Sequence, residues 1–146
     1  MKIDINTCTR DYNNKNIIVI GDIILDAYVL GNVNRISQEA PVPIVLTQHK
    51  DFKPGGAANV AINLSNLGAS VTLVGVSGFD SNHIKLIETL NNHKNIKTQI
   101  IQCDDRPTTV KTRIIANNRQ LVRLDDEIIK PVEKKIEHKI IDICES

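Results

Sequence analysis

The chain has 146 residues, of which 41% are hydrophobic and 24% charged, so it can enclose a core and should be globular and soluble. A formal net charge of +1 gives no general basis for nucleic acid or membrane binding, and no apolar run is long enough to span a bilayer. Cys8, Cys103 and Cys144 are widely spaced and fit neither a metal pattern nor a disulfide framework, which favours reduced thiols and a cytoplasmic location.

The first third of the chain predicts strands. Met1–Lys15 is a polar lead-in in which no secretory leader is visible, and Asn16–Ile20 is a β-branched apolar run that predicts a buried parallel strand. Gly31–Pro43 contains Gly, Asn, Ser and Pro residues and predicts an excursion from the main sheet. Its flanks, Tyr28–Leu30 and Ile44–Thr47, predict short edge strands.

The middle of the chain predicts two helices separated by a strand. Ala57–Leu67 has a helical apolar face and stops at Gly68; the residues of that face are Ala57, Val60, Ala61, Leu64 and Leu67. Ser70–Val76 predicts a second buried strand. Asp80–Asn91 predicts a helix capped by Asp80 or Ser81, with its inward side chains at Ile84, Ile87 and Leu90.

The last third predicts three more strands and a helix. The strands are expected at Lys97–Gln102, Thr108–Ala116 and Gln120–Asp125. Pro131 is expected to open the helix, whose apolar stripe consists of Val132, Ile136, Ile140 and Ile143. The element order predicts an α/β fold with a mainly parallel sheet and right-handed crossovers.

Gly55-Gly56-Ala57-Ala58-Asn59 is the most informative stretch of the sequence. Two glycines that enter a helix allow a ligand to approach the backbone and the unpaired N–H groups of the first turn. Asn59 adds a side chain that both donates and accepts hydrogen bonds, which suits a sugar. The alternative is that Gly55-Gly56 is only a tight turn and that Asn59 bonds a neighbouring loop.

Two carboxylates follow the first predicted strand. Ligands of open α/β sheets bind beyond the carboxyl ends of the strands, where Gly21-Asp22 is expected, and Asp26 comes four residues later. A carboxylate there can accept hydrogen bonds from two sugar hydroxyls. The alternative is that Asp22 caps a turn and Asp26 is a solvated surface charge.

Gly55–Ala61, Gly68 and Gly78 together resemble the N-terminal signature of the ribokinase family of carbohydrate kinases. Further stretches are similar to the branch of this family that uses ATP to phosphorylate the anomeric hydroxyl of D-glycero-D-manno-heptose 7-phosphate, on the route to ADP-heptose for lipopolysaccharide cores. The resemblance covers about residues 16–126, and the stretches that carry it are Gly21-Asp22, Leu25–Tyr28, Arg35–Pro43, Pro54–Ala61, Thr109, Lys111–Arg113 and Gln120–Asp125.

The resemblance implies a ribokinase-like domain with a mostly parallel sheet, flanking helices and a small β lid at about residues 28–46. The family's sugar contacts fall on Asp26, Gly55, Gly56 and Asn59, and Arg35 in the lid is assigned to substrate binding as well. The lid covers the sugar and often pairs with the lid of a second subunit, which implies a homodimer. Lid closure excludes water from a phosphoryl transfer.

Three basic residues are candidates for holding the 7-phosphate of such a substrate. Lys111 and Arg113 share a strand face, and Arg123 lies on the next strand. The alternative is a solvated basic face closed by the acidic run Asp125–Glu127. We favour that alternative for Lys111 and leave both open for Arg113 and Arg123.

The sequence departs from the family in its second half. The family's catalytic base lies in a Gly-Ala-Gly-Asp type segment, and an Asn-x-x-Glu segment organises Mg²⁺; neither occurs in these 146 residues, whose seven glycines all lie at or before Gly78. We therefore assign no catalytic residue and no metal ligand, and expect the chain to be the N-terminal, acceptor-binding half of a kinase domain. Alone it should be inactive, bind neither ATP nor Mg²⁺, and expose an apolar patch that promotes self-association.

Three alternatives remain for the function. The chain can be a non-catalytic module for sugar-phosphate binding or dimerisation, or it can belong to another sugar kinase of the ribokinase family. A nucleotide-binding Rossmann module is disfavoured, because the glycines do not follow a strand as G-x-G-x-x-G.

Overall fold

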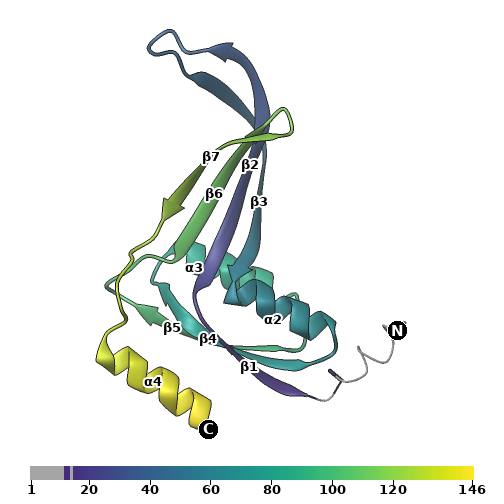
Figure 1. Cartoon of the computed structure of the whole chain (residues 1–146), viewed down its shortest axis with the longest axis vertical. Helices are drawn as coiled ribbons and strands as arrows, with labels where there is room; N and C mark the ends of the chain where they lie inside the picture. Colours follow the sequence, from purple (N-terminus) through teal and green to yellow (C-terminus); the bar gives the residue numbers. More distant parts are fainter. Residues whose placement is uncertain (1–11, 14) are drawn as a thin grey trace, which may run out of the picture.

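The computed structural model describes residues 12, 13 and 15–146 (Figure 1). Most of the expected lead-in Met1–Lys15, and with it Cys8, lies outside the described residues. The elements in chain order are β1 (Asn16–Ile20), β2 (Ile23–Ile36), β3 (Pro43–Gly56), α2 (Ala57–Asn66), β4 (Ser70–Gly78), α3 (Ser81–Leu90), β5 (Ile96–Cys103), β6 (Thr109–Ala116), β7 (Arg119–Asp126) and α4 (Lys134–Glu145).

The strands form two sheets. β1, β4 and β5 make a parallel sheet with β4 in the centre, while the second sheet has the order β3-β2-β6-β7. In the second sheet β2 and β6 are parallel, and the β2–β3 and β6–β7 pairs are antiparallel. The predicted α/β class is confirmed, with the difference that the strands divide between a parallel and a mixed sheet.

The β2–β3 hairpin is much longer than the sequence predicts. Each strand has 14 residues, so the ladder continues through Gly31 and only residues 37–42 form the connection. Gly31 does not break the strand, because it sits at a register shift where its backbone approaches Leu46 too closely for a side chain. β2 is also an inner strand between β3 and β6, so the edge-strand prediction is wrong for Tyr28–Leu30, whereas Ile44–Thr47 lies on the edge strand β3 as predicted. The far half of the hairpin projects from the body (Figure 1).

The core lies between the two sheets and helices α2 and α3. Its fully buried side chains include Leu25, Leu73, Leu86 and Leu90. Helix α2 buries Ala58 and Ala61. These small residues let the helix lie close to the strands beneath it, and the buried stripe is turned from the predicted face.

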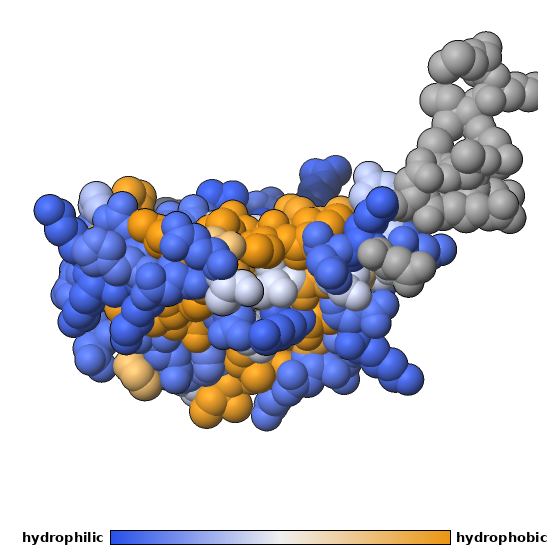
Figure 2. Space-filling model, turned by 90° about the horizontal axis from the view of Figure 1, so that it is seen from below, coloured by the Kyte–Doolittle hydropathy of each residue, from blue (hydrophilic) through white to orange (hydrophobic). Residues whose placement is uncertain are grey.

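Three predicted core positions are wrong. Val60 on α2 and Leu67 at its C-cap are exposed because the buried stripe is turned, and on α3 Leu86 is buried whereas Ile84 is exposed. Asn16–Ile20 is parallel as predicted, but β1 is an edge strand and its Ile18 and Ile20 are about half exposed. The view from below shows apolar surface left uncovered between polar side chains (Figure 2).

The last helix begins three residues later than predicted. Pro131 lies ahead of α4, whose N-cap is Glu133 in an extended conformation. The predicted apolar stripe is confirmed, since Ile136 is buried and Val132, Ile140 and Ile143 are partly buried. None of the helices in the described part of the chain is long and apolar enough to cross a bilayer.

Asp80 ties α3 to the start of β6. Its carboxylate accepts hydrogen bonds from the N–H groups of Asn82 and His83 at 3.0 Å and of Thr108 at 2.8 Å. Partial burial pushes the pKa of Asp80 upward, but the hydrogen bonds from Thr108, His83 and Asn82 outweigh it and lower the pKa. The predicted cap is confirmed, and this cap also orders the loop before β6.

We expect Asp80→Ala to lower the free energy of unfolding by about 2–4 kcal/mol, because a helix cap and the acceptor of a buried strand-end N–H are both lost. The folded-state pKa lies below the unfolded one, so this stabilisation is complete above about pH 4 and is lost as the pH falls through the folded value. Urea unfolding at pH 7 and pH 3 measures both effects. The exposed Asp104→Ala is the control, and an equal loss in both variants would contradict the assignment.

Candidate functional site

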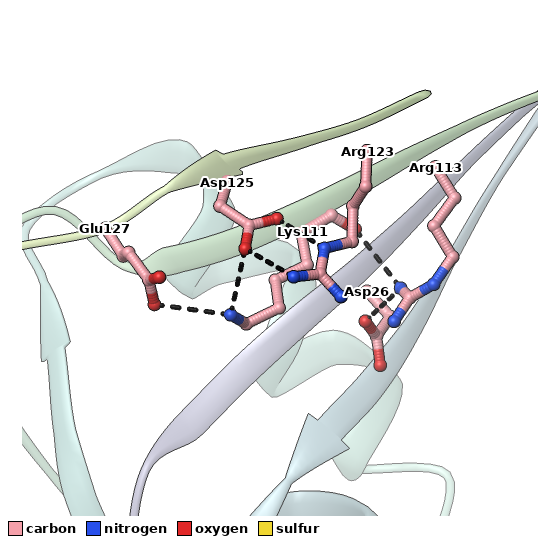
Figure 3. A network of polar contacts seen from close by, with 6 residues as sticks. All are labelled: Asp26, Lys111, Arg113, Arg123, Asp125 and Glu127. Carbon is pink, nitrogen blue, oxygen red and sulfur yellow. Dashed lines mark hydrogen bonds and ion pairs between the residues drawn. The ribbon is translucent and has the colours of Figure 1, made fainter. Parts of the chain in front are cut away.

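The mixed sheet has one polar and one apolar face. Strand alternation and register place Asp26 and Tyr28 of β2, Lys53 of β3, Lys111 and Arg113 of β6, and Arg123 and Asp125 of β7 on the same side. We call these seven residues the polar face. On the opposite side Leu25, Ala27 and Val110 are buried in the core. Figure 3 shows that charged side chains from neighbouring strands point toward one another on the polar face.

Asp26 and Gly55 are in direct contact. A Cβ added at Gly55 would lie 2.3 Å from Asp26 Oδ2, so the glycine leaves room for the carboxylate. Arg113 Nη1 donates a hydrogen bond to Asp26 Oδ1, and the two side chains are 23% and 19% exposed. This hydrogen bond raises the pKa of Arg113. Asp26 is therefore part of a shielded charge pair, and the alternative of an isolated solvated charge is wrong.

Gly56 turns the chain from β3 into α2. It has a φ of 56°, and an added Cβ would lie 2.3 Å from the carbonyl oxygen of Asp22, which accepts a hydrogen bond from the N–H of Ala57 at 2.9 Å. Only glycine adopts this conformation without strain. The turn that brings Gly55 against Asp26 thus depends on Gly56, so the structural and the ligand-binding interpretations of the two glycines are compatible.

Asn59 lies in the first turn of α2 and is exposed. Among residues 15–146 its side-chain amide has no hydrogen-bond partner, so the alternative that it bonds a neighbouring loop finds no support in this part of the chain. No side chain caps the N-terminus of α2 either. The amide and the first-turn N–H groups other than that of Ala57, which bonds the carbonyl oxygen of Asp22, are accordingly open to a ligand.

Lys111 and Arg123 are held by acidic partners. Lys111 Nζ lies 3.2 Å from Asp125 Oδ2 and 3.4 Å from Glu127 Oε2, and Arg123 donates to both oxygens of Asp125 at 2.8 and 2.9 Å (Figure 3). The hydrogen bond to Asp125 raises the pKa of Lys111, and that from Arg123 lowers the pKa of Asp125. This pairing fits the closed basic face expected for Lys111. Asp126 takes no part in it, because it pairs with Val110 on the opposite face.

Arg35 is remote from the other predicted site residues. It lies on β2 opposite Ile44 in the projecting half of the hairpin and is exposed. It lies nine positions beyond Asp26 on β2, which corresponds to roughly 30 Å of extended strand. The fold of one chain therefore does not bring Arg35 to Asp26.

A cavity of about 420 Å³ opens at the carboxyl ends of β1 and β4. Asp22, Val76 and Thr109 contribute to its wall, and Lys111 and Glu127 connect it to the polar face. The hollow lies where the sequence predicts ligand binding, beyond the ends of the parallel strands. Within the described ranges no three His, Cys, Asp or Glu side chains are arranged to hold a metal ion.

Sequence reasoning missed several residues of this region. Tyr28 and Lys53 belong to the polar face, and alternation from Asp26 together with the hairpin register would have identified them. Arg106 and Lys130 line the cavity. No motif marks them in the sequence, and their position depends on the loops before β6 and α4.

Comparison with known proteins identifies similar sequences along almost the whole chain. The family described as pfkB family carbohydrate kinase matches residues 14–145. The bifunctional protein HldE of Koribacter versatilis is 42% identical over 84% of this chain and 25% of its own length. That of Coxiella burnetii strain RSA 331 is 45% identical over 92% of this chain and 27% of its own length. The chain spans about a quarter of the length of these curated relatives.

Solved structures share the fold at lower identity. A carbohydrate kinase from Agrobacterium tumefaciens is similar with a TM-score of 0.64 and 24% identity, over 77% of this chain and 35% of the other. The Arabidopsis thaliana ribokinase complexed with ribose and ATP has a TM-score of 0.59 and 16% identity, over 80% of this chain and 36% of the other. The expected ribokinase-like fold is confirmed.

Proposed function

The chain belongs to the pfkB family of carbohydrate kinases, and on that premise we propose that it forms the acceptor-binding part of a heptose 7-phosphate kinase. The reaction would transfer a phosphoryl group from ATP to the anomeric hydroxyl of D-glycero-D-manno-heptose 7-phosphate, toward ADP-heptose and lipopolysaccharide cores. Identities of 42% and 45% with proteins named HldE support this branch of the family over other sugar kinases.

The observation that carries the proposal is the contact between Asp26 and Gly55 beside the start of α2. The carboxylate would accept hydrogen bonds from sugar hydroxyls while the hydrogen bond from Arg113 holds it in place. Gly55 and Gly56 would let the sugar approach the backbone, and Asn59 would bind a further hydroxyl. These groups bind and orient the acceptor.

ATP and Mg²⁺ would supply the phosphoryl group and neutralise the charge that develops on it. The sequence given contains no Gly-Ala-Gly-Asp or Asn-x-x-Glu segment, and the part of the chain that the structure describes has no cluster suited to a metal. We therefore assign none of its residues to ATP or Mg²⁺. The 146 residues are proposed to be the N-terminal part of the kinase domain.

The hairpin around residues 28–46 is proposed to be the lid and the site of homodimer formation. Its projecting part exposes Ile36, Val42 and Leu46, which a second lid would cover. A partner's hairpin would also explain a substrate-binding role for Arg35 that one chain cannot provide. We expect sedimentation velocity to show a dimer that Leu46→Glu dissociates; a wild-type monomer at micromolar concentration would contradict this assignment.

Isothermal titration with heptose 7-phosphate tests the proposed function, with Asn59→Ala as the informative variant. We expect the wild-type chain to bind the sugar phosphate and the variant to lose about 1–3 kcal/mol of binding free energy, because a ligand hydroxyl loses its partner. Asn63→Ala on the same helix is exposed and is the matched control. Equal affinity in all three proteins, with the fold intact, would remove Asn59 from the site.

A non-catalytic module for sugar-phosphate binding or dimerisation is the second candidate. It shares the acceptor site and the lid, and it differs in never meeting ATP. The coding DNA distinguishes the two, because a kinase requires an in-frame continuation with a Gly-x-Gly-Asp segment. Titration with ribose and fructose separates the heptose branch from other sugar kinases of the family.

A further inference from the structure

Two cations, Lys53 and Arg113, lie beside the ring of Tyr28. The acidic residues near them engage only some of their hydrogen-bond donors. The ring centroid is 5.4 Å from Lys53 Nζ and 5.4 Å from Arg113 Cζ, both within the range of cation–π contacts. Lys53 comes from β3 and Arg113 from β6, the strands on either side of β2. Lys53 Nζ and Arg113 Cζ are thus at most twice 5.4 Å apart, and both side chains lie on strands next to Asp26.

The hydrogen-bonding capacity of these two cations is largely free. Within the described ranges Arg113 donates only through Nη1, to Asp26 and to the carbonyl oxygen of Lys111, so its Nε and Nη2 donors remain available. Lys53 is 63% exposed and has Asp51 at 3.5 Å, an exposed pair that contributes little. Arg123 and Lys111, in contrast, direct their donors at Asp125 and Glu127.

We propose that Lys53 and Arg113, positioned by the ring of Tyr28, form an anion clamp that binds the phosphate monoester of the acceptor whose hydroxyls Asp26 holds. This rests on the proposed function of the same site. Of the three basic residues considered from the sequence it keeps Arg113, and it replaces Lys111 and Arg123 with Lys53. A dianionic phosphate offers acceptors to the free edge of the guanidinium and to the ammonium at once.

Tyr28 acts in this arrangement as a positioning residue. The negative face of its ring attracts both cations and limits the rotamers of two long side chains, so less conformational entropy is lost when the anion binds. Asp26 also restrains the guanidinium, through the hydrogen bond that it accepts from Nη1. The clamp favours phosphorylated sugars, because each cation makes a charge-assisted hydrogen bond to a phosphate dianion and only a weaker hydrogen bond to a neutral hydroxyl.

Titration of the full 146-residue chain with heptose 7-phosphate and with unphosphorylated heptose tests the clamp. We expect the wild type to prefer the phosphorylated sugar, and Lys53→Ala to weaken that binding about 10-fold while leaving affinity for the neutral sugar unchanged. Lys50→Ala removes an exposed lysine of the same strand on the opposite face and should change neither value. Tyr28→Phe should retain the preference and Tyr28→Leu should lose it.

The outcomes separate the clamp from the function on which it rests. Equal wild-type affinity for both sugars, or a preference that survives Lys53→Ala, overturns the clamp and leaves the sugar site standing. A wild-type chain that binds neither sugar overturns the proposed function and the clamp together. Circular dichroism of each variant identifies misfolding, and the exposed Lys53→Ala change keeps the test valid if Tyr28→Leu does not fold.

Discussion

A polypeptide of these 146 residues, supplied with ATP, Mg²⁺ and heptose 7-phosphate, is expected to show no phosphoryl transfer above the uncatalysed rate. The seven glycines all lie at or before Gly78, and the late helix α4 follows Pro131 and Glu133 without a glycine turn. Such a turn would be needed to present an anion hole and a base together. Losing the anion hole and the base together should lower the rate of phosphoryl transfer by many orders of magnitude, because groups of this kind act as a unit.

The aspartates near the site have other roles. The carbonyl of Asp22 closes the turn before α2, Asp26 holds Arg113, and Asp125 holds Lys111 and Arg123. Reassigning Asp26 or Asp125 as the base would break the ion pairs of the polar face, and Asp22 lies between the strands β1 and β2, without the glycine-rich turn into a helix that forms an anion hole. A coupled assay of ADP release measures the activity, with an intact HldE relative as the positive control. Turnover close to that of the control would show that the base lies within these residues.

The sequence was sufficient for the order and type of the elements. β-branched runs such as Asn16–Ile20 and Ser70–Val76 have no competing helical pattern, and Asp80 is a strong cap signal, so these predictions are confirmed. The length of the hairpin was not predictable in this way. A glycine such as Gly31 is typical of a strand break. Only the pairing with β3 shows that its missing side chain lets the backbone of Leu46 approach.

The inward faces of the helices were also only partly predictable. Val60 and Ala61 are neighbours on α2, and an apolar pattern alone does not say which of them the sheets cover. The contact with the strands favours Ala58 and Ala61, and Val60 is left exposed. The preference for small side chains on this face depends on the distance between the helix and the sheet. The sequence of one element does not determine that distance.

The candidate site, too, was only partly predictable from the sequence. Asp26 and Gly55 were predicted together, and the structure places them in contact. Which acid pairs with which base was not predictable, because Lys111, Arg113 and Arg123 differ only in the neighbours that the register of β2, β6 and β7 gives them. Arg113 reaches Asp26 across the β2–β6 pair, and this pairing sets it apart from the other two cations.

Asp26→Ala is expected to produce the largest loss of sugar-phosphate binding among single substitutions on the polar face. A carboxylate that accepts hydrogen bonds from two hydroxyls contributes about 1.5–3 kcal/mol for each, so the loss should reach about 3–6 kcal/mol. Arg113 would also lose the partner that orients it. Because its side chain is only 23% exposed, water would replace that partner poorly. We expect a further decrease of about 1–3 kcal/mol in the free energy of unfolding.

Titration calorimetry with heptose 7-phosphate measures the first effect and urea unfolding the second. Asp126→Ala is the matched control, since this aspartate is exposed on the opposite face of the sheet and should change neither quantity. Asp26→Asn separates the two effects, because the amide keeps the volume beside Gly55 and one acceptor while removing the charge. It should fold nearly as well as the wild type and still bind the sugar phosphate weakly. Binding by Asp26→Ala within a factor of about three of the wild type, less than one hydrogen bond is worth, would show that the sugar does not contact this carboxylate.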